Sequence, residues 1–157
     1  MRIKPIAALA MVVGLAALIG FADYAFRGGL GSASFQRVSP GRDGMVRLAV
    51  GSLSPLGVSF YRFLNAGNQE VRFFVARDEG GQLQVAFDAN EQCAKWQRGY
   101  RHEGEWVVCN KCDKAFRIRE VNAGGGGCKP IPLPFRVEGS DLVLTESDIL
   151  AGWRLFR

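Results

Sequence analysis

The number and spacing of the cysteines constrain this chain more than any other feature of its sequence. The chain has four cysteines. Cys109 and Cys112 form a Cys-x-x-Cys pair, and fifteen residues separate this pair from Cys93 on one side and from Cys128 on the other. The pair supplies two thiolates, and one more from each flank closes a cage that suits zinc, a single iron, cuprous ion or an iron–sulfur cluster. All four cysteines are therefore candidate ligands of a metal or cofactor.

Two other uses of the cysteines are open on the sequence alone. Four cysteines can form two disulfides, with three possible pairings. Cys109 and Cys112 can also be the dithiol of a thiol–disulfide oxidoreductase, although such a dithiol usually lies at a helix N-terminus and no helix is predicted to begin there. The segment "NAGGGGCKP" favours a metal, because its glycines permit positive φ and close approach of backbone N–H groups to sulfur.

From residue 45 onward, the apolar residues recur with a period of two, which predicts β-strands. Turn signals rich in Gly, Asn and Asp interrupt this pattern at residues 65–68 and 78–81. We therefore expect a small antiparallel meander over residues 45–88. Its expected strands are 46–50, 58–63, 70–76 and 83–87.

The C-terminal part predicts a hairpin of residues 135–137 and 142–144. Thr145 resembles the N-cap of a short helix that Gly152 would end. The final "WRLF" is expected to form an edge strand. The predicted fold class is therefore mainly β: small antiparallel sheets with a Cys-rich metal-binding loop region, a short C-terminal helix and one N-terminal membrane helix.

The N-terminal segment differs in character from the rest of the chain. Arg2 and Lys4 lead into eighteen uncharged residues, 5–22, a length between that of a signal-peptide core and a spanning helix. Basic residues before such a run direct the chain beyond it to the outer side of the membrane. The expected organisation is a signal peptide or membrane anchor helix at residues 1–26, a flexible linker at 27–44 and a β-rich metal-binding domain at 45–157.

Charge and motifs exclude several classes of function. The formal net charge is +5, from 20 Lys and Arg against 15 Asp and Glu, but no basic run or basic–aromatic stripe occurs, so nucleic-acid binding is not predicted. His102, the single histidine, lies in a hairpin-tip context and is expected to be solvated. The sequence offers no Ser-His-Asp set, carboxylate pair or phosphate loop. It indicates a non-enzymatic electron-transfer or metal-binding protein rather than a hydrolase or a kinase.

Several spaced segments, taken in order, resemble one known family. "VRFFVARDEGGQLQVAFDANEQC", "GYRHEGEWVVCNKCDKAF", "GGGGCKPIPLPF" and the closing "DILAGWRLF" are together similar to the FtrD-like family of membrane iron–sulfur proteins. The resemblance covers roughly residues 57–157. It implies an accessory of bacterial high-affinity iron uptake, in which an iron–sulfur centre passes electrons in support of a permease. It also implies that Cys93, Cys109, Cys112 and Cys128 are the ligands of that centre.

One residue departs from the family pattern. Where the pattern reads Phe-Asp-Ala-Cys-x-x-Cys, this chain reads "FDANEQC", which places Asn90 at the position of the first cysteine. If the family cage uses two Cys-x-x-Cys pairs, this chain has lost a ligand, and Cys128 or Asn90 must complete the set. If the cage uses the four cysteines present here, nothing is lost. The symmetrical spacing favours the second interpretation.

Two observations keep other cofactors open. The leader lacks the twin arginine by which folded cluster proteins are usually exported, and the cysteine spacing does not match ferredoxin patterns. The alternative is an extracytoplasmic zinc- or copper(I)-binding module that is structural or recruits a membrane partner. In either case we expect a single-pass protein of the bacterial inner membrane whose domain faces the periplasm, or a periplasmic protein if the leader is cleaved. The expected partner is a membrane permease or a redox protein.

Overall fold

The central strand of the fold is β4 (Glu70–Arg77), in which most residues are buried whichever face of the sheet they occupy. The computed structural model describes residues 34–157. β4 pairs antiparallel with β3 (Val58–Leu64) and with β5 (Leu83–Phe87), as the period-two pattern predicts for these three strands. Their aromatic and β-branched side chains fit a pleated surface covered on both faces.

A fourth strand, β1 (Phe35–Val38), pairs parallel with β3 and completes the order β1-β3-β4-β5. This strand lies inside the segment 27–44 that composition predicted to be a linker, and it makes the sheet mixed rather than wholly antiparallel. The pairing brings the rings of Phe35 and Phe60 to 5.7 Å between centroids in an edge-to-face contact. Because the segment is rich in Gly and Ser, its composition does not reveal this contact.

A second sheet has the order β2-β10-β9 and joins distant parts of the chain. It consists of β2 (Met45–Ala49), β10 (Asp141–Thr145) and β9 (Arg136–Glu138), all antiparallel. The β9–β10 hairpin confirms the predicted one. The meander predicted over 45–88 was wrong for β2, which pairs with β10 and not with β3. The pairing places Val46 and Leu48 of β2 beside Leu144 and Leu142 of β10 on one buried face, and the period alone cannot specify this partner.

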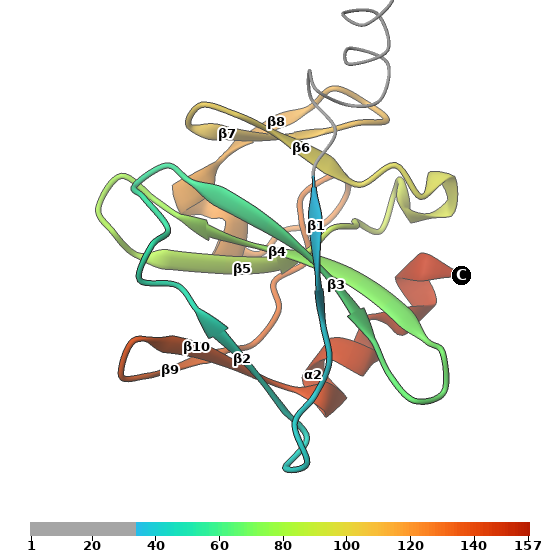
Figure 1. Ribbon diagram of the computed structural model, residues 1–157. Coiled ribbons are helices and arrows are strands. Elements are labelled where there is room, and N and C mark those ends of the chain that lie inside the picture. Colours follow the sequence, from blue (N-terminus) through green and yellow to red (C-terminus); the bar gives the residue numbers. More distant parts are fainter. Residues whose placement is uncertain (1–33) are drawn as a thin grey trace, which may run out of the picture. The chain divides into compact units, whose positions relative to one another are not determined.

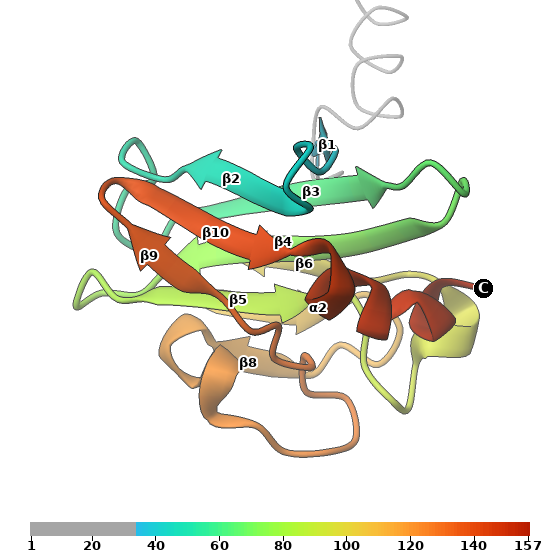
Figure 2. The same ribbon diagram turned by 90° about the horizontal axis from the view of Figure 1, so that it is seen from below.

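The third sheet has the order β6-β7-β8 and is antiparallel throughout. Its strands are β6 (Tyr100–Glu103), β7 (Trp106–Cys109) and β8 (Ala115–Arg117). His102 lies exposed near the turn between β6 and β7, where its sequence context placed it. Figure 1 shows the β1-β3-β4-β5 sheet between the other two, with β6-β7-β8 above it and β2, β9 and β10 below, and Figure 2 shows the same layers from below.

The main hydrophobic core lies between the central sheet and the β2-β10-β9 sheet. Its most buried members are Val46, Phe63, Val71, Phe73, Val75, Val85, Leu133, Leu142, Leu144 and Ile149. On the opposite face of β4, Phe74 packs edge-to-face on Tyr100, with 6.0 Å between the ring centroids. The central sheet is thus covered on both faces, and the β6-β7-β8 side carries the cysteines.

The C-terminal segment forms helices rather than a strand. Thr145 Oγ1 accepts a hydrogen bond from the backbone N–H of Asp148 at 3.1 Å and caps α2 (Glu146–Ala151), as predicted. The edge strand predicted for "WRLF" was wrong, because Trp153–Phe156 forms a 3-10 helix that continues directly from Gly152. Gly152 is packed so tightly on the ring of Phe87 that a Cβ there would overlap the ring. A side chain at position 152 would therefore force this segment away from β5.

The predicted N-terminal membrane helix lies outside the described residues. Within residues 34–157, no helix is long and apolar enough to cross a membrane.

Candidate metal centre

Cys93 is held by a turn that comes after β5. The side-chain oxygen of Asn90 accepts a hydrogen bond from the backbone N–H of Cys93 at 2.7 Å, and the backbone oxygen of Asn90 accepts one from Ala94 at 3.0 Å. These two bonds form a local turn that leads into the 3-10 helix Ala94–Trp96. Asn90 and Cys93 are both buried. The Asn-x-x-Cys spacing therefore lets Asn90 hold the backbone at Cys93.

Cys109 and Cys112 lie on the tight turn between β7 and β8. The backbone N–H of Cys109 donates to Lys114 at 2.9 Å, and the oxygen of Cys109 accepts from the N–H of Asp113 at 2.9 Å. Asp113 has a φ of 55°, in the left-handed region that closes such turns. Cys109 is buried at the end of β7, whereas Cys112 is exposed at the tip. No helix begins at Cys109 in the described chain, which removes the feature that usually activates a redox dithiol.

Cys128 reaches the same place from the glycine-rich loop after the 3-10 helix Ile118–Ala123. Gly124, Gly125 and Gly127 all have positive φ, a conformation that glycine adopts without strain. The hydroxyl of Tyr100 donates to the backbone oxygen of Cys128 at 2.5 Å, and the N–H of Gln92 donates to Gly127 at 3.3 Å. The loop is thus tied to both β6 and the turn that carries Cys93.

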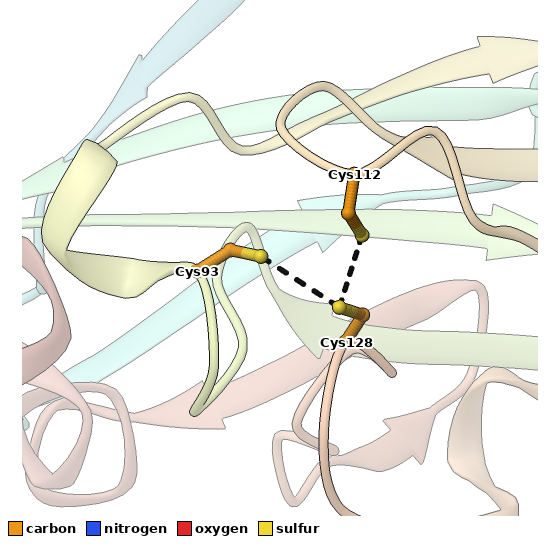
Figure 3. A group of neighbouring side chains, drawn as sticks. All are labelled: Cys93, Cys112 and Cys128. Atoms are coloured by element: carbon orange, nitrogen blue, oxygen red, sulfur yellow. Dashed lines mark hydrogen bonds between the residues drawn. The ribbon is translucent and has the colours of Figure 1, made fainter.

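The structure brings the sulfur atoms of Cys93, Cys112 and Cys128 together, within 4.8 Å of one another (Figure 3). Cys93 Sγ lies 3.7 Å from Cys128 Sγ, and Cys112 Sγ lies 2.9 Å from Cys128 Sγ. All four cysteines are free thiols, so the two-disulfide alternative does not describe this structure. These three cysteines form a group that could hold one metal ion.

The spacing of these sulfurs matches thiolate coordination in part. Around a tetrahedral ion with bonds of about 2.3 Å, neighbouring sulfurs lie about 3.8 Å apart. The separation of Cys93 and Cys128, 3.7 Å, is close to this value. Cys112 and Cys128 would have to move apart by about 1 Å, which the exposed turn carrying Cys112 allows. As a donor set, these soft thiols fit zinc, copper(I) or the iron of an iron–sulfur centre.

Cys109 is not part of the three-sulfur group but lies beside it. Its sulfur is 3.7 Å from the side-chain nitrogen of Asn90, which also donates to the Tyr100 hydroxyl at 2.9 Å. Cys109 is also close enough to Cys93 to influence the pKa of that thiol. Of the predicted ligands, the structure therefore gathers three and places the fourth next to them, against an amide.

The thiolate form of Cys93 is disfavoured in the absence of a cation. Burial raises the pKa of the Cys93 thiol to about 12, and the neighbouring thiols of Cys128 and Cys109 act in the same direction. A metal ion reverses this balance, because it replaces the thiol protons and neutralises the sulfurs together.

Composition alone does not identify Gln92 and Tyr100 as neighbours of the sulfurs. Gln92 Oε1 lies 3.1 Å from Cys128 Sγ, and the Tyr100 hydroxyl joins Asn90 to the backbone of Cys128. Gln92 and Asn90 both lie within three residues of Cys93, so closeness in sequence was the available signal for them. Tyr100 belongs to another strand, and only the fold brings it here. His102 lies outside the site, and its Nε2 is 2.7 Å from the oxygen of Gly104.

The decisive comparison is with protein families. The family model described as "Membrane iron-sulfur containing protein FtrD-like" matches residues 54–156, about two thirds of the chain. The chain belongs to the FtrD-like family. No curated protein and no solved structure matches it. The match includes the four cysteines, Asn90 and the glycine-rich loop, and it confirms the resemblance carried by the segments around them.

In this FtrD-like chain, Asn90 has a defined place beside the sulfurs. It is 2% exposed, its oxygen holds the N–H of Cys93, and its amide nitrogen is directed at Tyr100 and Cys109. Every polar atom of the side chain is therefore engaged. Asn90 acts as a hydrogen-bonding support of the sulfurs in this structure, and its amide can donate to Cys109 whether or not that sulfur binds a metal.

Asp88 is a buried carboxyl close to the candidate metal centre. It is 2% exposed, and its Oδ1 accepts from the backbone N–H of Tyr100 at 2.6 Å. Burial raises the pKa of Asp88 from its usual value of 3.8 to about 7, against the opposing effects of the Tyr100 N–H and of the Arg72 guanidinium. The carboxyl and the Cys93 and Cys109 side chains border the same small cavity.

The raised pKa of Asp88 predicts how stability depends on pH. The folded protein holds the proton more tightly than the unfolded chain, so the free energy of unfolding should fall as pH rises from 3.8 to about 7 and level off above that. The expected total fall is a few kcal/mol. Denaturant unfolding of the full-length protein between about pH 4 and pH 8 measures it. Asp88→Asn keeps an oxygen for Tyr100 and should flatten this slope, and an unchanged slope would contradict the prediction.

Proposed function

We propose that this FtrD-like protein is a membrane-associated electron-transfer protein whose Cys93, Cys109, Cys112 and Cys128 hold an iron–sulfur centre. The observation that carries a thiolate centre is the group of three sulfurs within 4.8 Å, with Cys109 beside it. Membership of the family of membrane iron–sulfur proteins supports the identity of the cofactor. When bound, such a centre takes up and releases single electrons.

The residues around the sulfurs suit this role. The Asn90 amide is placed to donate to Cys109, and N–H donors to sulfur stabilise its negative charge and raise the reduction potential of an iron centre. Cys93, Cys109 and Cys128 are buried, which limits access of water, whereas Cys112 is exposed at the surface. One exposed ligand gives an electron a short route to a partner, and three buried ones hold the centre in place.

A zinc or copper(I) site that stabilises the fold is the second candidate. It is favoured by the compactness of the sulfur group, because three sulfurs within 4.8 Å suit one ion better than several irons that share the thiolates. In that case the protein would be a structural module that holds its loops together and recruits a membrane partner.

The sequence and the family support a place for the protein at the bacterial inner membrane. We propose that residues 5–22 anchor the chain there, with the β-rich domain in the periplasm, or that they form a signal peptide whose removal leaves a periplasmic protein. The proposed role is to pass electrons in support of an iron permease, directly or through a redox protein. Family membership supports the membrane association.

Metal analysis distinguishes the two candidates. Full-length protein purified without air from its native membrane should contain iron and acid-labile sulfide, and should show a visible absorption band that bleaches on reduction. Copper without sulfide would refute the iron–sulfur centre, whereas zinc without iron or sulfide, in a colourless protein, would refute electron transfer and favour the structural role. In that case a chelator should unfold the loops around Cys93, Cys112 and Cys128.

A further inference from the structure

The exposed Cys112 lies at the edge of a basic surface centred on a tryptophan. We call Lys95, Trp96, Arg98 and Lys111 the Trp96 surface. The ammonium groups of Lys95 and Lys111 lie 4.3 Å and 4.6 Å from the centroid of the Trp96 ring, well within cation–π range. Lys95 is two residues after Cys93, and Lys111 directly precedes Cys112. The surface therefore joins the two turns that carry these cysteines.

The positive charges of this surface are not neutralised within the described domain. None of the ion pairs among residues 34–157 includes Lys95, Arg98 or Lys111. The nearest acid on the Cys112 turn, Asp113, is paired with Arg101 at 3.1 Å. A cluster of unpaired cations draws a negatively charged partner toward it and raises the rate of encounter.

Trp96 is itself unusual in being exposed. At 43% exposure, it is one of two large apolar side chains on the surface of residues 34–157, the other being Val137 on the distant strand β9. Its backbone N–H donates to the oxygen of Cys93 at 3.1 Å, which places Trp96 on the turn that carries this cysteine. An exposed tryptophan flanked by two cations is typical of the centre of a protein interface.

The surface also lies next to the buried sulfurs. Arg98 and Lys111 border the small cavity that Cys93 and Cys109 line. A partner seated on the Trp96 surface is thus placed over the exposed cysteine and close to the buried ones, which is the arrangement that electron transfer between two proteins requires.

We propose that the Trp96 surface is the docking site of a one-electron carrier protein with an acidic face. This inference rests on the proposed electron-transfer function and adds the partner's chemistry to it. A protein is favoured over an anionic membrane because the surface offers a single aromatic ring and no apolar helix face to insert into lipid. The partner's carboxylates pair with Lys95, Arg98 and Lys111, and an apolar group packs on the Trp96 ring.

The test uses full-length protein in detergent micelles and flavodoxin, a small acidic flavoprotein that carries single electrons, as the probe. Binding is measured by titration at about 20 mM and about 300 mM salt. The variant Lys95→Glu/Lys111→Glu reverses two charges of the surface, and Lys95→Gln/Lys111→Gln serves if the first variant does not fold. Arg37→Glu/Arg42→Glu is the matched control, because both residues are exposed on β1 and the turn after it and the charge change is the same.

We expect the Glu variant to bind flavodoxin at least about tenfold more weakly than wild type at low salt, the Gln variant to lose less, and the control to bind as wild type does. High salt should reduce the difference. Equal binding by wild type and the Glu variant would overturn the proposal. The proposal would also be overturned if the Glu variant lost binding to phosphatidylglycerol vesicles while its binding of flavodoxin was unchanged. That result would assign the surface to the membrane.

Metal analysis of the same samples separates this inference from the proposed function. A zinc-loaded protein that still binds flavodoxin in a charge-dependent way would refute electron transfer and leave the docking surface standing. An iron–sulfur protein that binds flavodoxin equally well with and without the charge reversal would refute the docking surface alone.

Discussion

Replacing Cys128 with serine is expected to lower the metal affinity of the full-length protein by at least about tenfold. Removing a residue that only supports a metal ligand already lowers metal affinity by about ten- to a hundredfold, and Cys128 is itself a candidate ligand. Cys128 is the centre of the sulfur group: its Sγ is 2.9 Å from Cys112 and 3.7 Å from Cys93. Serine has nearly the same shape but offers a hard oxygen that is protonated at neutral pH. Iron, sulfide and zinc content per chain, with circular dichroism to follow the fold, measures the effect.

Gln92→Ala provides the matched control for this change. It leaves all four thiols in place and removes an oxygen that accepts from the Cys128 thiol at 3.1 Å, a contact that does not stabilise a metal-bound thiolate, so it should lower metal content much less than Cys128→Ser. Cys109→Ser reports on the fourth ligand, and a loss as large as that of Cys128→Ser would show that Cys109 binds the metal. Full metal content in a folded Cys128→Ser protein would show that the metal is bound elsewhere.

Gly99→Ala is expected to destabilise the domain by roughly 2–5 kcal/mol, the largest stability effect we predict. Gly99 has a φ of 59°, which alanine adopts only with strain, and a Cβ there would overlap the buried carboxyl group of Asp88. Asp88 cannot move freely, because its Oδ1 accepts a hydrogen bond from the N–H of Tyr100. The backbone oxygen of Gly99 accepts a hydrogen bond from the N–H of Asn110, next to the Cys112 turn. Denaturant unfolding of the full-length protein measures the loss.

Gly104→Ala separates the two causes. Gly104 has the same φ of 59°, but nothing lies within 4 Å of the position that its Cβ would take. It should therefore show the backbone strain alone, about 1 kcal/mol, and leave the cysteine region intact. The difference between the two variants measures the steric conflict with Asp88. Equal stability of the two variants would mean that the Asp88 side chain moves away from the added Cβ at no cost in free energy.

The sequence predicted the elements whose causes are local. Alternation of apolar residues identified β3, β4 and β5, turn chemistry identified the β9–β10 hairpin, and the capping pattern of Thr145 identified α2. The same reasoning failed where the partner of a strand is distant. β2 pairs with β10, and β1 pairs parallel with β3, because the burial of facing side chains selects these partners.

The candidate metal centre shows the same division. By itself, the sequence determined which residue types are available: four thiols at matched spacing, a glycine-rich loop before Cys128, and an asparagine at position 90. The spacing could not determine which sulfurs meet, because loops of fifteen residues can close in several ways at similar entropic cost. The tertiary structure placed Cys112 with Cys93 and Cys128, and set Cys109 against Asn90. Contacts between strands and loops distant in sequence, above all the hydroxyl of Tyr100 on the backbone of Cys128, decided that arrangement.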